Sequence, residues 1–474
     1  MAITHTADES IEAQIEEFWD GSIIPTLTEF MRIPNESPAF DREWKRNGHM
    51  DRAVELVHRW IAGQKLRNCT VELLRDGQRT PVILAVIEGQ APGTVLLYGH
   101  LDKQPPMEGW REGLGPWDPV LDRQGRLYGR GGADDGYSAF AAVAAIKALQ
   151  EQGLPHGRLV VLIECSEESG SPDLSHYMNA YRDRIGTPEF IVCLDSGCGN
   201  YEQLWCTTFL RGLVMGSIHV GVLSEGVHSG MAGGIVPSPM RVLRRVLDRL
   251  EDGATGRILP PGLQVEIPEI RREQARQAAD VLGASIAGDF PFLEGARPES
   301  DSTEELILNS SWRSALAITA QEGLPAWGQG GNVLLPYVKV KLSLRIPPTL
   351  DPGKAAAALK QALETDPPHG AQVSVSAGGM PGWEAPPTAP WLETAMNRAS
   401  RAFFGKDACY FGAGGTIPFM AMMGRQYPKA QFLITGVLGP HSNAHGPNEF
   451  LHVPYAKKLT CCLASVLADH AARN

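Results

Sequence analysis

The stretch Thr94-Val-Leu-Leu-Tyr-Gly-His-Leu-Asp102 places a run of mostly apolar residues directly before an imidazole and a carboxylate. Such a short apolar run is typical of a strand buried on both faces. Similar runs begin at Pro81, Arg158 and Glu189, and helical patterns lie between them, most clearly in the Ala-rich stretch 136–152. Continuous apolar strands alternating with helices predict a mainly parallel α/β sheet with helices on both faces.

The pattern changes near residue 208, where polar and apolar residues begin to alternate along the chain. Three segments alternate in this way, beginning at Val214, Lys339 and Gln372. Alternation is typical of strands with one solvated face in an antiparallel sheet. We therefore predict a larger α/β domain, residues 1–207 plus 381–474, that carries a smaller inserted α+β domain, residues 208–380. Residues 253–295 within the insertion look rich in loops.

The overall composition excludes several classes of protein. The 474 residues are 43% apolar and 20% charged, which argues against a disordered or fibrous chain. A net charge of −11 without a basic run disfavours binding to nucleic acid or to an anionic membrane. No apolar stretch approaches the roughly 20 residues of a membrane span, and the N-terminal residues do not form a signal peptide pattern. Eight cysteines without a C-x-x-C pair favour reduced thiols and a cytoplasmic protein.

Acidic and imidazole side chains gather at the predicted carboxyl ends of the strands, where active sites of α/β folds tend to lie. They occur in five segments: His100-Leu-Asp102, Asp134-Asp135, Glu167-Glu168, Asp195 and His445-Gly-Pro-Asn-Glu449. Each segment alone is typical of solvated loop charges or of carboxylates at a helix N-terminus. Together in one cleft the carboxylates would repel one another, and a divalent cation removes that penalty. The sequence therefore indicates a metal site.

These segments also resemble the motifs of a known superfamily. In order and spacing, Gly99-His-Leu-Asp102, Gly129-Arg-Gly-Gly-Ala-Asp-Asp135, Ser166-Glu-Glu-Ser-Gly-Ser171, Leu194-Asp-Ser-Gly197 and His445-Gly-Pro-Asn-Glu449 are similar to those of the co-catalytic dinuclear metallopeptidases. That superfamily includes carnosine dipeptidase, carboxypeptidase G, aminoacylase and succinyl-diaminopimelate desuccinylase. The resemblance begins near residue 80, runs to the end of the chain and is greatest to the carnosine-dipeptidase branch. A sixth motif, Gly226-Val-His-Ser-Gly230, matches as well.

The resemblance implies five metal ligands. His100 and Asp195 would hold one ion, Glu168 and His445 the other, and Asp134 would bridge the two. We expect two divalent ions per subunit, zinc before manganese or cobalt, because mixed imidazole and carboxylate ligation suits all three. Two such ions about 3.5–4 Å apart can hold a bridging hydroxide and polarise a scissile carbonyl.

Other residues of these motifs have implied roles around the metals. Glu167 would be the general base, and Asp102 would hydrogen-bond His100 and fix its tautomer. An alignment that makes Asp135 the bridge is an alternative to Asp134. Gly136 is a departure, because the family usually has a lysine at this position after the paired aspartates.

Four candidate substrate-binding residues follow from the resemblance. His228 would reach the active site of a partner subunit, and Arg345 would pair with the terminal carboxylate of the substrate. Thr416, in Gly414-Gly-Thr-Ile-Pro418, would meet substrate through a turn, and Asn332 is a further candidate. The alternatives are a loop histidine for His228, an exposed strand charge for Arg345 and a helix N-cap for Thr416.

The resemblance therefore implies a metal-dependent hydrolase that cleaves the amide bond of dipeptides or short peptides. The larger domain would be catalytic, and the inserted domain would serve as a lid and form a homodimer. A deacylase of N-acyl amino acids would use the same site and is an open alternative. A catalytically silent binding protein is a third reading, which the presence of all five ligands and the base disfavours.

Overall fold

The computed structural model describes residues 5–415 and 417–473. The chain divides into two compact units. Unit 1 comprises Met1–Thr208, Ala385–Phe411 and Ile417–Asn474, and unit 2 comprises Phe209–Glu384 and Gly412–Thr416. Among the described residues, no helix combines the length and the apolar character needed to cross a membrane.

Unit 1 is built on a six-stranded sheet with the order β1-β2-β6-β3-β7-β17. Its strands are β1 (Cys69–Leu74), β2 (Val82–Ile87), β6 (Arg158–Glu164), β3 (Thr94–His100), β7 (Phe190–Cys193) and β17 (Gln431–Ile434). The four strands β6, β3, β7 and β17 run parallel, and β1 and β2 add an antiparallel edge. The strands β2 and β7 are buried along their whole length, as a sheet covered on both faces requires. The prediction of a mainly parallel sheet is confirmed.

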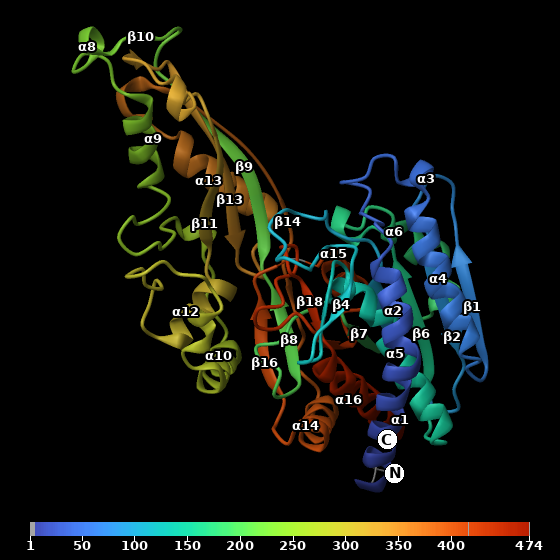
Figure 1. The fold of residues 1–474 in the computed structure, drawn as a ribbon. Helices are drawn as coiled ribbons and strands as arrows, with labels where there is room; N and C mark the ends of the chain where they lie inside the picture. The colour runs from blue at the N-terminus through green and yellow to red at the C-terminus, as the bar shows by residue number, and fades with distance from the viewer. Residues whose placement is uncertain (1–4, 416, 474) are drawn as a thin grey trace. The chain divides into compact units, whose positions relative to one another are not determined.

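Helices cover both faces of this sheet (Figure 1). Neighbouring residues of a strand point to opposite faces. On β3, the Tyr98 ring stacks on Phe419 of α15 (Pro418–Gln426) with ring centroids 3.7 Å apart. The next residue, Gly99, instead lies against Ser138 of α5 (Tyr137–Glu151), where even a methyl group would come within 2.0 Å of the serine oxygen. The two helices therefore pack on opposite faces, as predicted.

The remaining helices of unit 1 surround this core, with α16 packed against α5, α14 and α1. They are α1 (His5–Phe18), α2 (Ile24–Met31), α3 (Trp44–Asn47), α4 (His49–Gly63), α6 (Leu174–Ala180), α7 (Arg182–Ile185), α14 (Pro390–Phe404) and α16 (Val453–Ala472). A small sheet adds β4 (Val120–Leu121), β5 (Arg126–Tyr128) and β18 (Phe450–His452). The strands β8 (Trp205–Leu210) and β16 (Cys409–Ala413) lie where the chain passes between the units.

Unit 2 contains a four-stranded antiparallel sheet with the order β11-β13-β9-β14. Its strands are β11 (Ala315–Glu322), β13 (Tyr337–Ile346), β9 (Gly212–Gly221) and β14 (Gln372–Met380). Alternate residues of β13, from Val338 to Ile346, are buried, and they form one core with α9 (Pro239–Leu247) and α13 (Pro352–Glu364). The predicted antiparallel sheet with alternating burial is therefore confirmed.

The rest of unit 2 includes several helices that the sequence did not indicate, and the longest of them lies within residues 253–295. Residues 253–295 were expected to be rich in loops, but α10 (Glu269–Leu282) occupies fourteen of them. Its buried face consists of Arg271, Gln274, Ala275 and Ala278, so the large apolar residues that mark most helices are missing from it. The other elements are β10 (Val227–His228), α8 (Ser229–Ala232), α11 (Ser285–Gly288), α12 (Thr303–Ser311), β12 (Val333–Leu334) and β15 (Trp383–Glu384).

Candidate metal centre

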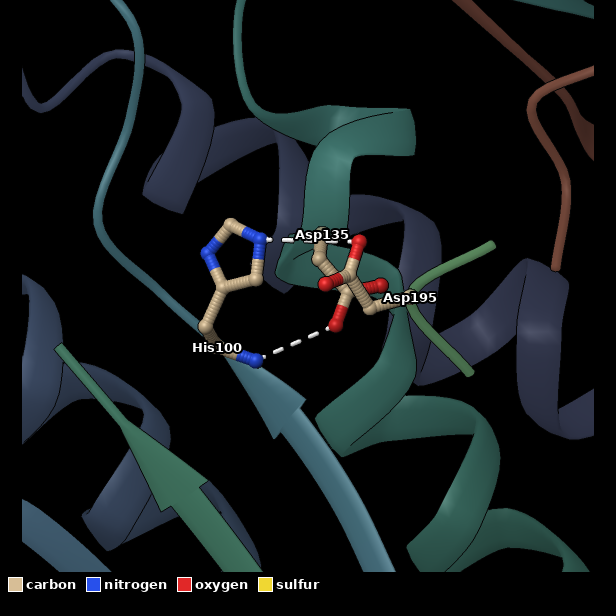
Figure 2. A group of neighbouring side chains, drawn as sticks. All are labelled: His100, Asp135 and Asp195. Atoms are coloured by element: carbon tan, nitrogen blue, oxygen red, sulfur yellow. Dashed lines mark hydrogen bonds and ion pairs between the residues drawn. The ribbon is translucent and has the colours of Figure 1, made fainter. Parts of the chain in front are cut away.

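His100, the last residue of β3, lies at the centre of a group of carboxylates in unit 1 (Figure 2). Its Nε2 atom lies 3.8 Å from Asp195 Oδ1 and 3.3 Å from Asp134 Oδ1. Asp195 follows β7, and Asp134 lies in the turn Gly132–Gly136 before α5. Parallel strands that end at one edge of the sheet therefore bring these side chains together, as the strand-end pattern predicts.

A second imidazole approaches the same carboxylate from the other side. His445 Nε2 lies 3.0 Å from Asp134 Oδ2 and 3.5 Å from Glu168 Oε2. One oxygen of Asp134 thus faces each imidazole, which is the arrangement that a bridging ligand needs. His445 is 56% exposed, whereas the side chain of Asp134 is only 6% exposed. The centre is therefore open to solvent on the His445 side.

Asp135 has a different set of contacts from its neighbour. Its Oδ2 accepts a hydrogen bond from the backbone N–H of His100 at 3.1 Å (Figure 2). Its other oxygen, Oδ1, is buried without a hydrogen-bond partner among the described residues. His100, Asp135 and Asp195 can each offer a ligand atom within 4.8 Å of one another, as can His100, Asp134 and Glu168. Asp134 alone of the two aspartates lies between the imidazoles.

The buried polar atoms of this cluster fit a bound cation. His100 Nε2 and Glu168 Oε1 are buried and have no hydrogen-bond partner among the described residues. Burial first, and then the Asp134 carboxylate, raises the pKa of Glu168 to about 8. Burial also raises the pKa of Asp195. Protein groups alone therefore leave these carboxylates poorly compensated, and divalent cations would satisfy both the orphaned atoms and the charge.

Asp102 ties two of the site segments together. Its carboxylate oxygens accept hydrogen bonds from the backbone N–H groups of Glu167 and Glu168, each at 3.0 Å. His100 Nδ1 lies 3.4 Å from Asp102 Oδ1 and 3.1 Å from the Asp102 carbonyl oxygen. Asp102 therefore orients the His100 ring and also fixes the short helical turn Glu167–Ser169.

Sequence reasoning missed a buried ion pair behind the centre. Arg130 pairs with Glu449, and both side chains are at most 1% exposed. Glu449 also accepts a hydrogen bond from Gly131 N at 2.9 Å, while Arg130 donates to the Gly446 carbonyl at 2.9 Å. The pair thus joins the loop of His445 to the turn of Asp134. The motif that contains Glu449 was recognised, but nothing in the sequence indicates which residue Glu449 contacts.

A further contact that the sequence did not indicate involves Gln104. Its Nε2 donates a hydrogen bond to Glu168 Oε2 at 2.6 Å. Gln104 follows the Gly99–Asp102 motif by two residues, so its nearness to the motif is the one signal that could have identified it. The hydrogen bond holds one Glu168 oxygen in place, opposite the orphaned Oε1.

Three of the four candidate substrate residues, His228, Asn332 and Arg345, belong to unit 2. His228 is exposed at the end of β10, and its Nδ1 accepts a hydrogen bond from Gly230 N at 3.1 Å. Asn332 lies beside it, because its carbonyl accepts from Ser229 N at 2.9 Å. Arg345 lies on β13, and burial lowers its pKa. Thr416 lies outside the described residues.

The side chain of Arg345 has no hydrogen bond or ion pair with any described residue, although it is half-buried. A guanidinium that is partly desolvated without a protein acceptor is expected to bind an anion from outside the chain.

The chain belongs to a known peptidase family, as its fold and ligand cluster suggest. The model of peptidase family M20/M25/M40 matches residues 96–469. This match spans most of the chain and confirms the superfamily resemblance.

Named relatives and solved structures support this membership. The chain is 28% identical over 430 residues to the cysteinylglycine-S-conjugate dipeptidase of Corynebacterium striatum, covering 86% of this chain and 90% of the relative. It is 29% identical over 472 residues to the Beta-Ala-His dipeptidase of Homo sapiens, covering 92% and 88%. In fold it is similar to the dipeptidase Dug1p of Saccharomyces cerevisiae, with a TM-score of 0.76, 21% identity and coverage of 99% and 100%. Human carnosine dipeptidase 1 gives a TM-score of 0.74 at 23% identity, with coverage of 98% and 99%.

Proposed function

We propose that this protein is a dinuclear metallopeptidase that hydrolyses the amide bond of dipeptides or short peptides. The observation that carries the proposal is the Asp134 carboxylate, which presents one oxygen to each of two imidazoles beside further carboxylates. The named dipeptidases above align over most of both chains, which favours a dipeptide substrate.

The proposed ligands divide into two sets around Asp134. His100 and Asp195 would hold one ion and Glu168 and His445 the other, since each imidazole lies within 4 Å of its partner carboxylate. Two divalent ions, zinc before manganese or cobalt, would polarise the scissile carbonyl and make a water molecule more acidic. Asp102 and Gln104 would keep the ligands in orientation before substrate binds.

Glu167 is the proposed general base. Its backbone N–H is held by Asp102, which fixes the residue beside Glu168. No described side chain hydrogen-bonds its carboxylate, so the carboxylate is available to a water molecule. Burial, followed by Asp195, raises the pKa of Glu167 well above its ordinary value. A carboxyl group of raised pKa accepts a proton from water and returns it to the leaving amine more readily than an ordinary one.

Metal content and activity of wild type and Glu167→Gln test this function. A panel of dipeptides and N-acyl amino acids would be used, with Glu202→Gln as a control, because Glu202 lies on the surface beside Lys406. We expect about two metal ions per chain in all three proteins and a fall of about 10²- to 10⁴-fold in kcat for Glu167→Gln alone. If the wild type hydrolyses N-acyl amino acids but no dipeptide, the protein is a deacylase and not a dipeptidase. A wild type without metal would refute the proposal.

A homodimer formed through unit 2 is part of the proposal. The strand β11 is a sheet edge, and six of its eight residues are exposed, so a second copy has an unpaired edge available to it. We propose that unit 2 acts as a lid and that His228, Asn332, Arg345 and Thr416 bind substrate, His228 in the partner's site. A cytoplasmic location is proposed from the eight cysteines, none of which forms a disulfide.

Mixing two inactive variants tests whether His228 acts across the dimer. If it does, a dimer of Glu167→Gln with His228→Ala contains one site in which Glu167 and His228 are both intact. Random mixing makes half of the dimers mixed, so about a quarter of wild-type activity should return. Differently tagged chains would confirm that mixed dimers form. If their activity does not recover, His228 acts in the site of its own subunit or has no part in catalysis.

A further inference from the structure

Gly136 leaves no space for the lysine that the family motif usually has at this position. A methyl group on Gly136 would lie 2.4 Å from Phe30 Cε1 and 2.6 Å from the Gly131 carbonyl oxygen. Both distances are far below van der Waals contact. The Gly131 oxygen is a backbone atom, so it cannot move away by a change of rotamer. Any side chain at position 136 would displace Phe30, which is the penultimate residue of α2.

A different lysine has its ammonium group beside the same phenylalanine. Lys103 is fully buried, and its Nζ lies 4.1 Å from the centroid of the Phe30 ring. Nζ donates hydrogen bonds to the carbonyl oxygens of Ile33 at 2.7 Å, Phe30 at 2.9 Å and Met31 at 3.4 Å. An ammonium group has three donors, so these carbonyls satisfy it fully. They also lie at the C-terminus of α2, where a helix favours positive charge.

The rest of Lys103 contacts the turn that carries Asp134 and directly follows the segment that carries His100. Its aliphatic chain covers Gly131, where a methyl group would come within 2.5 Å of Lys103 Cε. Gly131 precedes the turn of Asp134 and has a positive φ of 79°. The main chain of Lys103 directly follows Asp102, and its N–H donates to the Asn35 carbonyl at 3.2 Å. Its carbonyl accepts from Ser37 N at 2.9 Å.

We infer that Lys103 is a positioning residue of the metal centre, supplying a buried amino group from the loop after β3, whereas the family motif usually has its lysine after the paired aspartates. Anchored on the carbonyls that end α2, it holds Asp102, and through Asp102 the ring of His100. By packing on Gly131 it also fixes the turn of Asp134. The inference rests on the proposed function, because it assumes that these residues bind metal.

Lys103→Met tests the inference, because methionine keeps the aliphatic chain and removes the ammonium group. The matched control is Arg158→Met. Arg158 also donates to two backbone carbonyls, those of Arg184 and Ile185, and pairs with Glu88, but it contacts no residue of the metal centre. Metal-free protein would be titrated with Zn²⁺ against a chromophoric chelator, and Tm would be measured with and without metal.

We expect Lys103→Met to weaken the affinity of the metal-free protein for at least one Zn²⁺ ion by about 10- to 100-fold. Arg158→Met should lower Tm and leave both affinities within twofold of wild type. If Lys103→Met does not fold, Lys103→Gln replaces it in the same titration. Because glutamine keeps two N–H donors, its affinity for at least one Zn²⁺ ion should still be weaker than that of wild type, but by less than the loss expected for methionine. Unchanged affinities in a folded Lys103 variant, with only Tm lowered, would overturn the inference.

The titration separates this inference from the proposed function. If the wild type binds two Zn²⁺ ions but hydrolyses no peptide, the proposed substrate is wrong. The Zn²⁺ affinities of the Lys103 variants would then still test the role of Lys103. A wild type that binds no Zn²⁺ would overturn both.

Discussion

The two units hold their functional residues in opposite kinds of surroundings. In unit 1, His100 is buried at the end of β3 and Asp134 is buried within the turn Gly132–Gly136. In unit 2, His228 is exposed on β10, Asn332 is exposed just before β12, and Arg345 is half-buried without a protein acceptor for its side chain. The candidate metal ligands therefore all lie in unit 1, whereas the candidate substrate residues have side chains with few protein partners.

This difference separates two requirements of the chemistry. A metal centre needs several ligands at fixed distances before substrate arrives, so its residues gain from burial and from partners such as Asp102. Residues that recognise substrate need open contacts and lose affinity if protein groups already satisfy them. Variants of the two units should therefore fail in these two different ways.

The largest effect is expected from Asp134→Asn in unit 1. An amide has one oxygen in place of two, so it cannot present an anionic oxygen to each imidazole as Asp134 does. We expect kcat to fall by at least about 10³-fold and metal content to fall below two ions per chain. Metal analysis and activity measure both. Asp135→Asn is the comparison, since an amide oxygen can still accept the hydrogen bond from His100 N. A greater loss of metal in Asp135→Asn would make Asp135 the bridge.

Arg345→Met in unit 2 should cause a smaller and different loss. Removing a guanidinium that pairs with a substrate carboxylate costs about 10- to 100-fold in kcat/KM. The loss should vanish for C-terminally amidated peptides, and metal content should not change. Lys341→Met is the control, because Lys341 is an exposed cation on the same strand. An equal loss for free and amidated peptides would show that Arg345 does not recognise the carboxylate.

The clustering of the candidate metal ligands in unit 1 was predictable from the sequence to a large extent. His100 ends a short apolar strand, Glu168 and Asp195 each follow one, and strand ends at one sheet edge meet in space. The Arg130–Glu449 pair was not predictable, because its members lie 319 residues apart and no periodic pattern relates them. Lys103 gave no signal either, since a lysine is normally exposed and its burial depends on carbonyls of α2.

The fold of unit 2 was less predictable than that of unit 1. Its sheet has the alternating pattern that marks one buried face, so the strands were recognised. The helix α10 was missed because Arg271 and Gln274 lie on its buried face, where Arg271 pairs with Glu384. A helix that buries polar groups in pairs leaves no apolar stripe in the sequence.

The smallest of these effects concerns stability rather than activity, and it is specific to unit 1. His470 of α16 packs between Phe190 and Trp391, with ring centroids 5.4 and 5.5 Å away. Burial first, and then Arg473, lowers its pKa to about 3. The unfolded chain therefore takes up a proton below about pH 6.5 that the folded chain does not. Stability contributed by the neutral ring should fall by about 1.4 kcal/mol per pH unit between about pH 6 and pH 3.

His470→Phe should remove this pH dependence, because phenylalanine keeps the aromatic packing and cannot be protonated. Urea unfolding at pH 6.5 and pH 5 should show a loss that is greater in wild type than in the variant by about 2 kcal/mol. Glu189 Oε1 lies 3.3 Å from His470 Nε2 and would oppose the effect, but Glu189 also pairs with Arg473, which reduces its influence on the ring. Equal losses in the two proteins would mean that Glu189 compensates the buried imidazolium and that acid does not act on unit 1 through this residue.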